Sequence, residues 1–407
     1  MIAHKFGISQ SLDLYFLSIT IPIILISIFT YAIPLAYLPL FFKIKEASGE
    51  KEAWLVGWNF FNLISIFFFL LGVLLFLFAE PIIKLLHPHL DIDNLRSTKT
   101  LFQILSIGTI FGGIFSLLRA YFHSSNRFFI PALAPIIVNL SVISSVLAFA
   151  DIWGNKSLAF GMTFGLCAQA LILLGLFGFK KHFYRFQLPK FNNNQKSLLI
   201  SILIVFGIEG LGQSFTLIDR IFASQISPGM VSSLSFASTI LNLPIALVGM
   251  SLGVVVMPSL SEFSANNDFG NIIKVLKKSF IYILIVILPF LLIFLFKSNV
   301  IIKLLYEHGE FSTSATEFSA SALKYYSFGL LFYAAHIIFV RIYYALQKAY
   351  VLIFITLIGF IIKLSLSYYL TPIMSHNGLA LATSISYSVN VLLLSGFLFW
   401  KLKPKSS

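Results

Sequence analysis

Four ionisable residues of this 407-residue chain lie within or at the end of long apolar runs. Glu209 lies in "VFGIEGLGQSF", Asp219 and Arg220 lie in "LIDRIFAS", and Lys363 lies in "IGFIIKLSLSYY". Charged side chains at membrane depth are rare, and they mark ion pathways, substrate pathways or buried charge pairs. We therefore expect Lys363 to pair with Glu209 or Asp219, either for ion coupling or for packing alone.

Four further polar residues are candidates for contact with a transported substrate. Asp13 follows Ser11 at the start of an apolar run, where a helix N-cap is the simpler interpretation. Asn139 lies inside another apolar run, and we favour a hydrogen bond to a neighbouring helix over contact with cargo. Arg119 and Arg341 lie at predicted cytoplasmic helix ends, where such side chains usually extend to the interface. Contact with a lipid phosphate is the alternative for these two arginines.

The composition that surrounds these residues requires lipid. Hydrophobic residues make up 58% of the chain and charged residues 11%, whereas a soluble domain has roughly 25% charged residues. We predict an all-α integral membrane protein with about eleven transmembrane helices, because eleven stretches are long and apolar enough to span a bilayer. These stretches are residues 14–42, 53–79, 99–122, 128–150, 157–178, 196–222, 231–260, 276–297, 319–344, 350–371 and 379–400.

The distribution of Lys and Arg predicts the orientation. One alternate set of loops carries twice as many of these residues as the other, and the richer set is expected in the cytoplasm. The N-terminus is then outside and the C-terminus cytoplasmic. The segment 179–196 carries charges, a proline and an asparagine run, so we interpret it as a linker. We therefore predict two helical bundles, residues 1–185 with five spans and residues 186–407 with six.

The pentapeptide IIKLL occurs at 82–86 and again at 301–305, which suggests an internal duplication. Nearly the same shift along the chain also aligns "LLRAYF" with "FVRIYY" and "SLAFG" with "GLALA". Each half has four spans counted from the pentapeptide's own span, and an even shift in span number makes the repeats parallel. The span at 196–222 has no partner in the first half, so we expect a twelve-helix plan without its first helix, whether genuinely or through a misplaced start codon.

The sequence offers no sign of catalysis. It has no phosphate-binding loop, zinc-protease motif or nucleophile elbow, and its one cysteine excludes a disulfide framework within the chain. We expect the "HPHLDID" stretch to be a solvated loop and not a metal site. The net charge of +13 lies in short segments between apolar runs, so we expect no nucleic-acid partner.

Several stretches resemble the MurJ/MviN lipid II flippases of the multidrug/oligosaccharidyl-lipid/polysaccharide exporter superfamily. "NRFFIPALAPIIVNL" resembles the signature of that family's fifth helix, and "KFGISQSLDLYFLSITIP" is similar to its run from helix one into helix two. "LIDRIFAS", "LLYEHGEFSTSAT", "RIYYALQKA" and "NGLALATSIS" also match in order and spacing. The resemblance covers almost the whole chain.

The resemblance implies two bundles of six helices around a central cavity, with Asp13 near its outer mouth. It further implies that Asp219 matches an acidic residue of a sodium site in some relatives, and that Lys363 stands where the family often has Asn. We expect the Lys363 ammonium to replace that ion. The family's cavity arginines align with Ile26 or Ser27 and with Thr239, none of which is basic. A pyrophosphate in this cavity would therefore need other cations.

The function expected from the resemblance is flipping of lipid II, an undecaprenyl-pyrophosphate-linked glycan, across the bacterial inner membrane for peptidoglycan synthesis. One alternative is a flippase for another lipid-linked polysaccharide, such as O-antigen or capsule precursor, or a drug exporter of the same superfamily. The other is a transport-inactive scaffold for cell-wall enzymes. The expected partners are the lipid-linked glycan, membrane lipids and cell-wall synthesis enzymes. No cofactor is expected, and Na+ or H+ coupling is left open.

Overall fold

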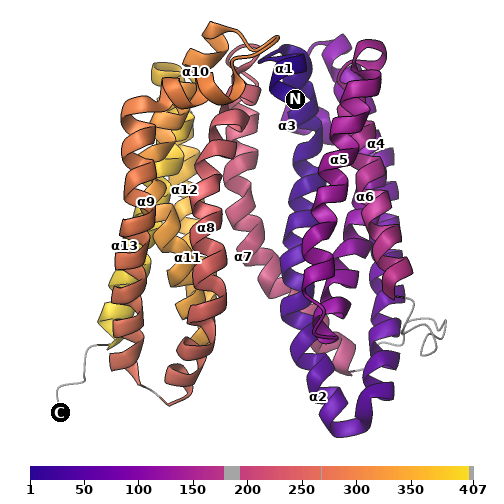
Figure 1. Ribbon diagram of the computed structural model, residues 1–407, viewed down its shortest axis with the longest axis vertical. Coiled ribbons are helices and arrows are strands. Elements are labelled where there is room, and N and C mark those ends of the chain that lie inside the picture. The colour runs from indigo at the N-terminus through magenta and orange to yellow at the C-terminus, as the bar shows by residue number, and fades with distance from the viewer. Residues whose placement is uncertain (178–192, 267, 403–407) are drawn as a thin grey trace. The chain divides into compact units, whose positions relative to one another are not determined.

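The computed structural model describes residues 1–177, 193–266 and 268–402, and in these residues all regular structure is helical (Figure 1). The chain divides into two compact units, each described here by itself. Unit 1 contains Met1–Ile2 and Leu14–Gly210, and unit 2 contains Ala3–Asp13 and Leu211–Ser407. The predicted boundary at 185/186 lies outside the described residues, so it stays a prediction.

Unit 1 is built from one very long helix and four shorter ones, together with the first part of α7. Its helices are α2 (Gln10–Leu77), α3 (Ala79–Leu86), α4 (Ile92–Ser124), α5 (Phe129–Trp153) and α6 (Lys156–Leu176). Gly49, at φ 87° and ψ 169°, interrupts α2, and the ribbon reverses direction at the foot of this helix in Figure 1. Glycine suits this position because positive φ is open to it without steric penalty.

Unit 2 contains the remaining helices and nearly all of the short first one. These are α1 (Ile2–Phe6), α7 (Asn193–Ala223, from Leu211 onward), α8 (Met230–Ala265), α9 (Phe269–Tyr306), α10 (Thr313–Ser327), α11 (Leu330–Ala345), α12 (Ala349–Met374) and α13 (His376–Leu402). Helices α10 and α11 bend by 51° at their junction and together have the length and hydropathy of one span.

The predicted number of membrane spans is not confirmed. Among the described residues, eight helices are long and apolar enough to cross a membrane, or nine if the bent pair counts as one span. Helix α2 counts once in this total although Gly49 divides it. The predicted spans 14–42 and 53–79 lie on either side of this break, and the predicted span 196–222 lies in α7, which is not among the eight.

The duplication is visible in the backbone of the two units. The shift that aligns "SLAFG" with "GLALA" places Asn126 on Gln347, and both residues have a positive φ, of 57° and 56°. The same shift places Gly154 on Ser375, with φ/ψ of 53°/−134° and 54°/−141°. Non-glycine residues adopt positive φ rarely, so a common origin is the simplest explanation of these matching turns.

Helix boundaries follow the same shift. Helix α4 corresponds to the bent pair α10 and α11, α5 to α12, and α6 to α13. Asp91 caps α4 by accepting a hydrogen bond from the Asn94 amide at 2.7 Å, and the equivalent Ser312 caps α10 through the Ala315 amide at 3.2 Å. The "HPHLDID" stretch thus supplies a helix cap.

The two IIKLL lysines lie beside carboxylates at the ends of their helices. Lys84 lies 2.7 Å from Glu80, and Lys99 lies 2.9 Å from the same carboxylate. Hydrogen bonds from these two ammonium groups lower the pKa of Glu80 to about 2. Lys303 lies 3.5 Å from Glu307 in unit 2. The Lys84 and Lys303 side chains are exposed, as expected of lysines that extend from a helix end to water.

An aromatic cluster forms the core of one end of unit 1. Tyr121 is fully buried and contacts Tyr37, Trp54 and Phe177, with ring centroids 4.9, 5.8 and 5.6 Å away. Its hydroxyl donates a hydrogen bond to the Gly57 carbonyl. The buried hydroxyl therefore has a partner, as a phenol in an apolar core requires.

We expect Tyr121→Phe to lower the free energy of unfolding by about 1 kcal/mol, because the buried hydrogen bond is lost while the ring remains. Unfolding by SDS titration in mixed micelles measures this change. The matched control is Tyr369→Phe on α12, where the residue is 68% exposed. Equal stability of the two variants would contradict the role assigned to the Tyr121 hydroxyl.

Candidate functional site: a buried ion pair at a four-helix junction

Lys363 lies on the buried face of α12. The buried residues of this helix include Thr356, Gly359, Lys363 and Ser367, spaced by three or four residues as one helical face requires. Gly359 allows close approach of α13, because a Cβ at this position would lie 2.2 Å from the Asn390 side-chain oxygen. The helix is otherwise apolar, and hydropathy alone would orient it toward lipid.

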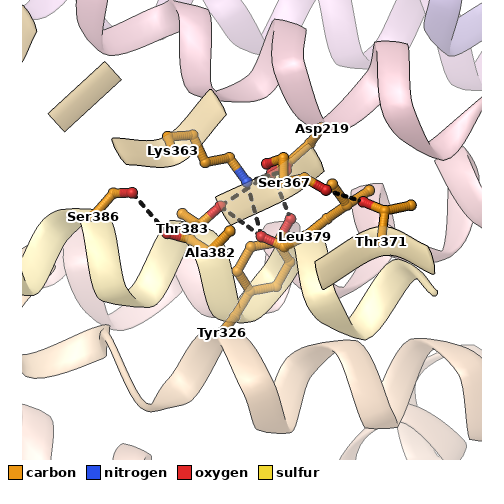
Figure 2. Close-up of polar contacts among 9 residues, drawn as sticks. All are labelled: Asp219, Tyr326, Lys363, Ser367, Thr371, Leu379, Ala382, Thr383 and Ser386. Atoms are coloured by element: carbon orange, nitrogen blue, oxygen red, sulfur yellow. Dashed lines mark hydrogen bonds and ion pairs between the residues drawn. The ribbon is translucent and has the colours of Figure 1, made fainter. Parts of the chain in front are cut away.

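The Lys363 ammonium makes its polar contacts entirely within unit 2. It donates to the Asp219 carboxylate of α7 and, at 2.8 Å, to the main-chain carbonyl of Leu379 on α13 (Figure 2). The lysine side chain is 0% exposed. The expected pairing with Asp219 is therefore observed, whereas Glu209, the other expected partner, belongs to unit 1.

The second oxygen of the Asp219 carboxylate has partners of its own. It accepts hydrogen bonds from the Tyr326 hydroxyl of α10 at 3.0 Å and from the Thr383 hydroxyl of α13 at 3.3 Å. Figure 2 shows these side chains converging from separate helices on the ion pair. We call Asp219, Tyr326, Lys363, Leu379 and Thr383 the ion-pair cluster.

The cluster is electrically balanced: one carboxylate faces one ammonium, and neutral groups complete the hydrogen bonding. A buried charge without a partner costs several kcal/mol, so the geometry needs all of its hydrogen bonds. Four helices of unit 2 contribute to it, namely α7, α10, α12 and α13. The cluster thus connects helices that are distant in sequence. A change of charge at a single position therefore affects the contacts between these helices.

Sequence reasoning identified only the two charged members of the cluster. Tyr326 lies in "KYYSFG" and Thr383 in "NGLALATSIS", and neither is distinguishable from an ordinary packing residue by type. The Leu379 contribution comes from a main-chain carbonyl, which has no side-chain signature. The sequence indicated only that Leu379 and Thr383, four residues apart, would lie on one face of the same helix.

Asp13 caps a helix, but not its own. Its carboxylate accepts hydrogen bonds from the amides of Gly229 at 2.6 Å and Ser232 at 2.7 Å, at the N-terminus of α8. The first turn of α2 is instead capped by Ser9, whose hydroxyl accepts from the Leu12 amide at 3.3 Å. The simple N-cap interpretation of Asp13 is therefore wrong, because α2 begins at Gln10, before Asp13. An anion here complements the positive end of the α8 dipole.

The remaining candidates stand outside the cluster. Asn139 is exposed on α5, and its amide has no hydrogen bond to another described residue, so helix bonding is not its role in unit 1. Glu209 is half-buried, with no ion-pair partner in the described part of the chain. Arg119, Arg220 and Arg341 are also half-buried, Arg119 and Arg341 near the ends of α4 and α11.

The positions aligned with the family's cavity arginines have different surroundings. Ile26 of α2 is buried against α4, where Gly112 makes room for it: a Cβ on Gly112 would lie 2.6 Å from the Ile26 side chain. Ser27 is half-buried, and Thr239 is exposed on α8. The Thr239 hydroxyl bonds the Ser235 carbonyl of its own helix at 2.8 Å. None of these residues supplies a cation.

Two basic side chains line a pocket of about 300 Å³ in unit 1. Lys45 comes from α2 near its break, and Arg127 from the turn between α4 and α5. Trp54 forms part of the wall, and its indole donates to Glu50 at 3.1 Å. The Ser125 hydroxyl is buried in the same wall without a hydrogen-bond partner among the described residues. Glu50 also lines the pocket, so two cations and one carboxylate face it.

The chain contains two repeated helical units, and one of them buries a charge pair. These features are typical of one class of protein, the secondary transporters with internal repeats. The family model "Lipid II flippase MurJ" matches residues 2–406. This chain belongs to the lipid II flippase MurJ family. It is accordingly a multi-pass protein of the bacterial inner membrane.

Individual relatives agree with this assignment. A probable lipid II flippase MurJ of Thermotoga maritima is 30% identical, over 100% of this chain and 81% of that protein. A probable lipid II flippase MurJ of Buchnera aphidicola subsp. Schizaphis graminum is 27% identical, over 100% of this chain and 79% of that protein.

Solved structures confirm the fold class. A structure titled lipid II flippase MurJ, inward closed conformation, has a TM-score of 0.84 and 27% identity, over 98% of this chain and 83% of that one. An inward-facing multidrug resistance MATE family transporter of the MOP superfamily has a TM-score of 0.83 over 100% of this chain and 98% of that one. At 11% identity, the second likeness shows the fold alone.

We expect Asp13→Ala to lower the free energy of unfolding by about 1–2 kcal/mol, because two amides at the α8 N-terminus lose a charged acceptor. SDS titration in mixed micelles measures the change. The control is Asp93→Ala, an exposed carboxylate in the first turn of α4. If Asp13→Ala is no less stable than Asp93→Ala, the capping role is wrong.

Proposed function

We propose that this protein is a flippase that moves lipid II, an undecaprenyl-pyrophosphate-linked peptidoglycan precursor, from the cytoplasmic to the outer leaflet by alternating access. The observation that carries the proposal is the family match over residues 2–406. The repeated units support it, because transporters of this architecture bind substrate between their repeats. The protein is a transporter without catalytic chemistry and without a resident cofactor.

The orientation proposed from the loop charges places the N-terminus outside and the C-terminus in the cytoplasm. Membrane lipids surround the protein, and cell-wall synthesis enzymes are its proposed protein partners. Sodium and proton gradients are both candidates for the energy source beside the membrane potential. Asn139, exposed on α5, and the half-buried Arg119 and Arg341 remain candidates for contact with cargo or lipid phosphate.

Recognition of the pyrophosphate requires cations, since a multiply charged anion cannot enter a low-dielectric site unpaired. The positions aligned with the family's arginines supply none, which favours a second candidate function: flipping of a different lipid-linked polysaccharide. We propose that the Lys45 and Arg127 pocket supplies part of the missing positive charge for either cargo. Arginine suits phosphate through paired hydrogen bonds.

Complementation of a bacterial strain depleted of its lipid II flippase tests the first function. We expect growth and normal cell shape when the full chain is expressed, and accumulation of lipid II in the inner leaflet when it is not. Membrane abundance of the protein is measured in parallel. No rescue at normal abundance contradicts lipid II flipping, and rescue of an O-antigen or capsule flippase mutant instead would support the second candidate.

We expect the double variant Lys45→Gln/Arg127→Gln to bind lipid II at least about 10-fold more weakly, because charge-assisted hydrogen bonds to phosphate are lost. Native mass spectrometry of the purified protein with lipid II measures the affinity. The matched control is Lys277→Gln/Lys278→Gln, which removes two exposed charges from α9. Equal affinity of the two double variants would refute the role of the pocket.

A further inference from the structure

The groups around the Lys363 nitrogen have the chemistry of a cation site. A carboxylate oxygen of Asp219 and the main-chain carbonyl of Leu379 accept its hydrogen bonds, the latter at 2.8 Å. The Thr383 hydroxyl lies 3.1 Å from the same carbonyl. Carboxylate, carbonyl and hydroxyl oxygens are the ligands that hard metal cations prefer. In this chain the positive charge at their centre belongs to a side chain.

A sodium ion does not fit this arrangement. The ammonium already occupies the position that faces both the Asp219 oxygen and the Leu379 carbonyl. A second cation beside it would share one carboxylate with a like charge, because the cluster contains a single acidic residue. Like charges at such distances in a buried site repel strongly. The sodium site implied by the family resemblance is therefore not available here.

We propose that Lys363 is a tethered cation that replaces sodium, so that unit 2 of this protein holds its ion-pair cluster together without an inorganic ion. The lysine stem enters from α12, and the ammonium holds α7 and α13 through the Asp219 carboxylate and the Leu379 carbonyl. A dissociable ion would leave and return during a transport cycle, whereas a tethered ammonium stays. Function of this protein is therefore independent of sodium at this site.

Ser367 is a further polar residue on the buried face of α12. It lies one helical turn after Lys363 on the same buried face of α12 and is 0% exposed. Its hydroxyl has no hydrogen-bond partner among the described residues. A shorter neutral residue at position 363 would leave the Asp219 carboxylate, the Leu379 carbonyl and the Thr383 hydroxyl around a space without a cation. The chain then becomes a sodium binder.

Thermal unfolding of the purified full chain tests the proposal, in sodium chloride and in choline chloride at equal ionic strength. We expect the same melting temperature in both salts for the wild type. Lys363→Asn should melt lower in choline and regain roughly 3–8 °C in saturating sodium, because a bound ion stabilises the folded state. Potassium and lithium measure the selectivity.

Two variants separate a specific site from a general salt effect. Asp219→Asn/Lys363→Asn keeps the shape of the cluster but removes its carboxylate, and it should show no sodium response. Lys324→Asn makes the same substitution at an exposed position of α10 and should behave as the wild type does. A sodium response in either variant equal to that of Lys363→Asn would overturn the assignment to this cluster.

The wild type decides the outcome even if no Lys363 variant folds. Stabilisation of the wild type by sodium, or stoichiometric binding of radioactive sodium that Asp219→Asn abolishes, would overturn the proposal. A folded Lys363→Asn protein without a sodium response would also overturn it. Absence of sodium binding to the wild type supports it. These readouts do not involve cargo, so they are independent of whether the proposed flipping of lipid II is correct.

Discussion

The burial of the Lys363 ammonium beside the Asp219 carboxylate is the constraint on which the packing of unit 2 depends. The Lys363 and Asp219 side chains are 0% and 11% exposed, and removal of one partner of such a buried pair typically costs about 3–5 kcal/mol. The arrangement is stable because each charged group has further hydrogen bonds, to Leu379, Tyr326 and Thr383. Four helices must therefore keep a fixed register. A shift of any one of them disturbs its hydrogen bonds to the other three.

The polypeptide passes between the two units inside helices and not in loops. The first crossing lies between Ile2 and Ala3 in α1, the second between Asp13 and Leu14 in α2, and the third between Gly210 and Leu211 in α7. The crossings in α2 and α7 each have a bonded carboxylate on the unit 2 side. Asp13 binds the amide end of α8, and Asp219 joins the ion-pair cluster. Both carboxylates thus hold their own stretch of helix within unit 2 by polar contacts, and Glu209 lies on the unit 1 side of the crossing in α7.

Sequence reasoning established the helical membrane class, the duplication, the family and the pairing of Lys363 with one of two carboxylates. It did not choose between Glu209 and Asp219, because both lie on one helix and only tertiary packing assigns them to different units. The acceptor role of Asp13 depends on amides that lie far along the chain, which no local pattern encodes. Asn139 was expected to bond a helix, yet it is exposed, since a polar residue in an apolar run carries no directional information.

The duplication allows the two explanations of the ion pair, packing and function, to be weighed. At the shift that places Asn126 on Gln347, the residues Tyr326, Lys363 and Thr383 correspond to Leu105, Val142 and Met162 of unit 1. The backbone of the two repeats agrees closely, down to the left-handed residues that follow α4 and α11.

Unit 1 thus has apolar side chains where unit 2 has a tyrosine, a lysine and a threonine, and its described residues contain no counterpart of α7 and Asp219. Apolar groups of similar volume commonly stabilise a core as well as a buried ion pair does, or better. Packing alone therefore does not require a lysine at position 363. In unit 2 the Lys363 ammonium has a carboxylate partner that unit 1 lacks, and the role that we propose for it is to keep Asp219 neutralised while its helices take part in transport.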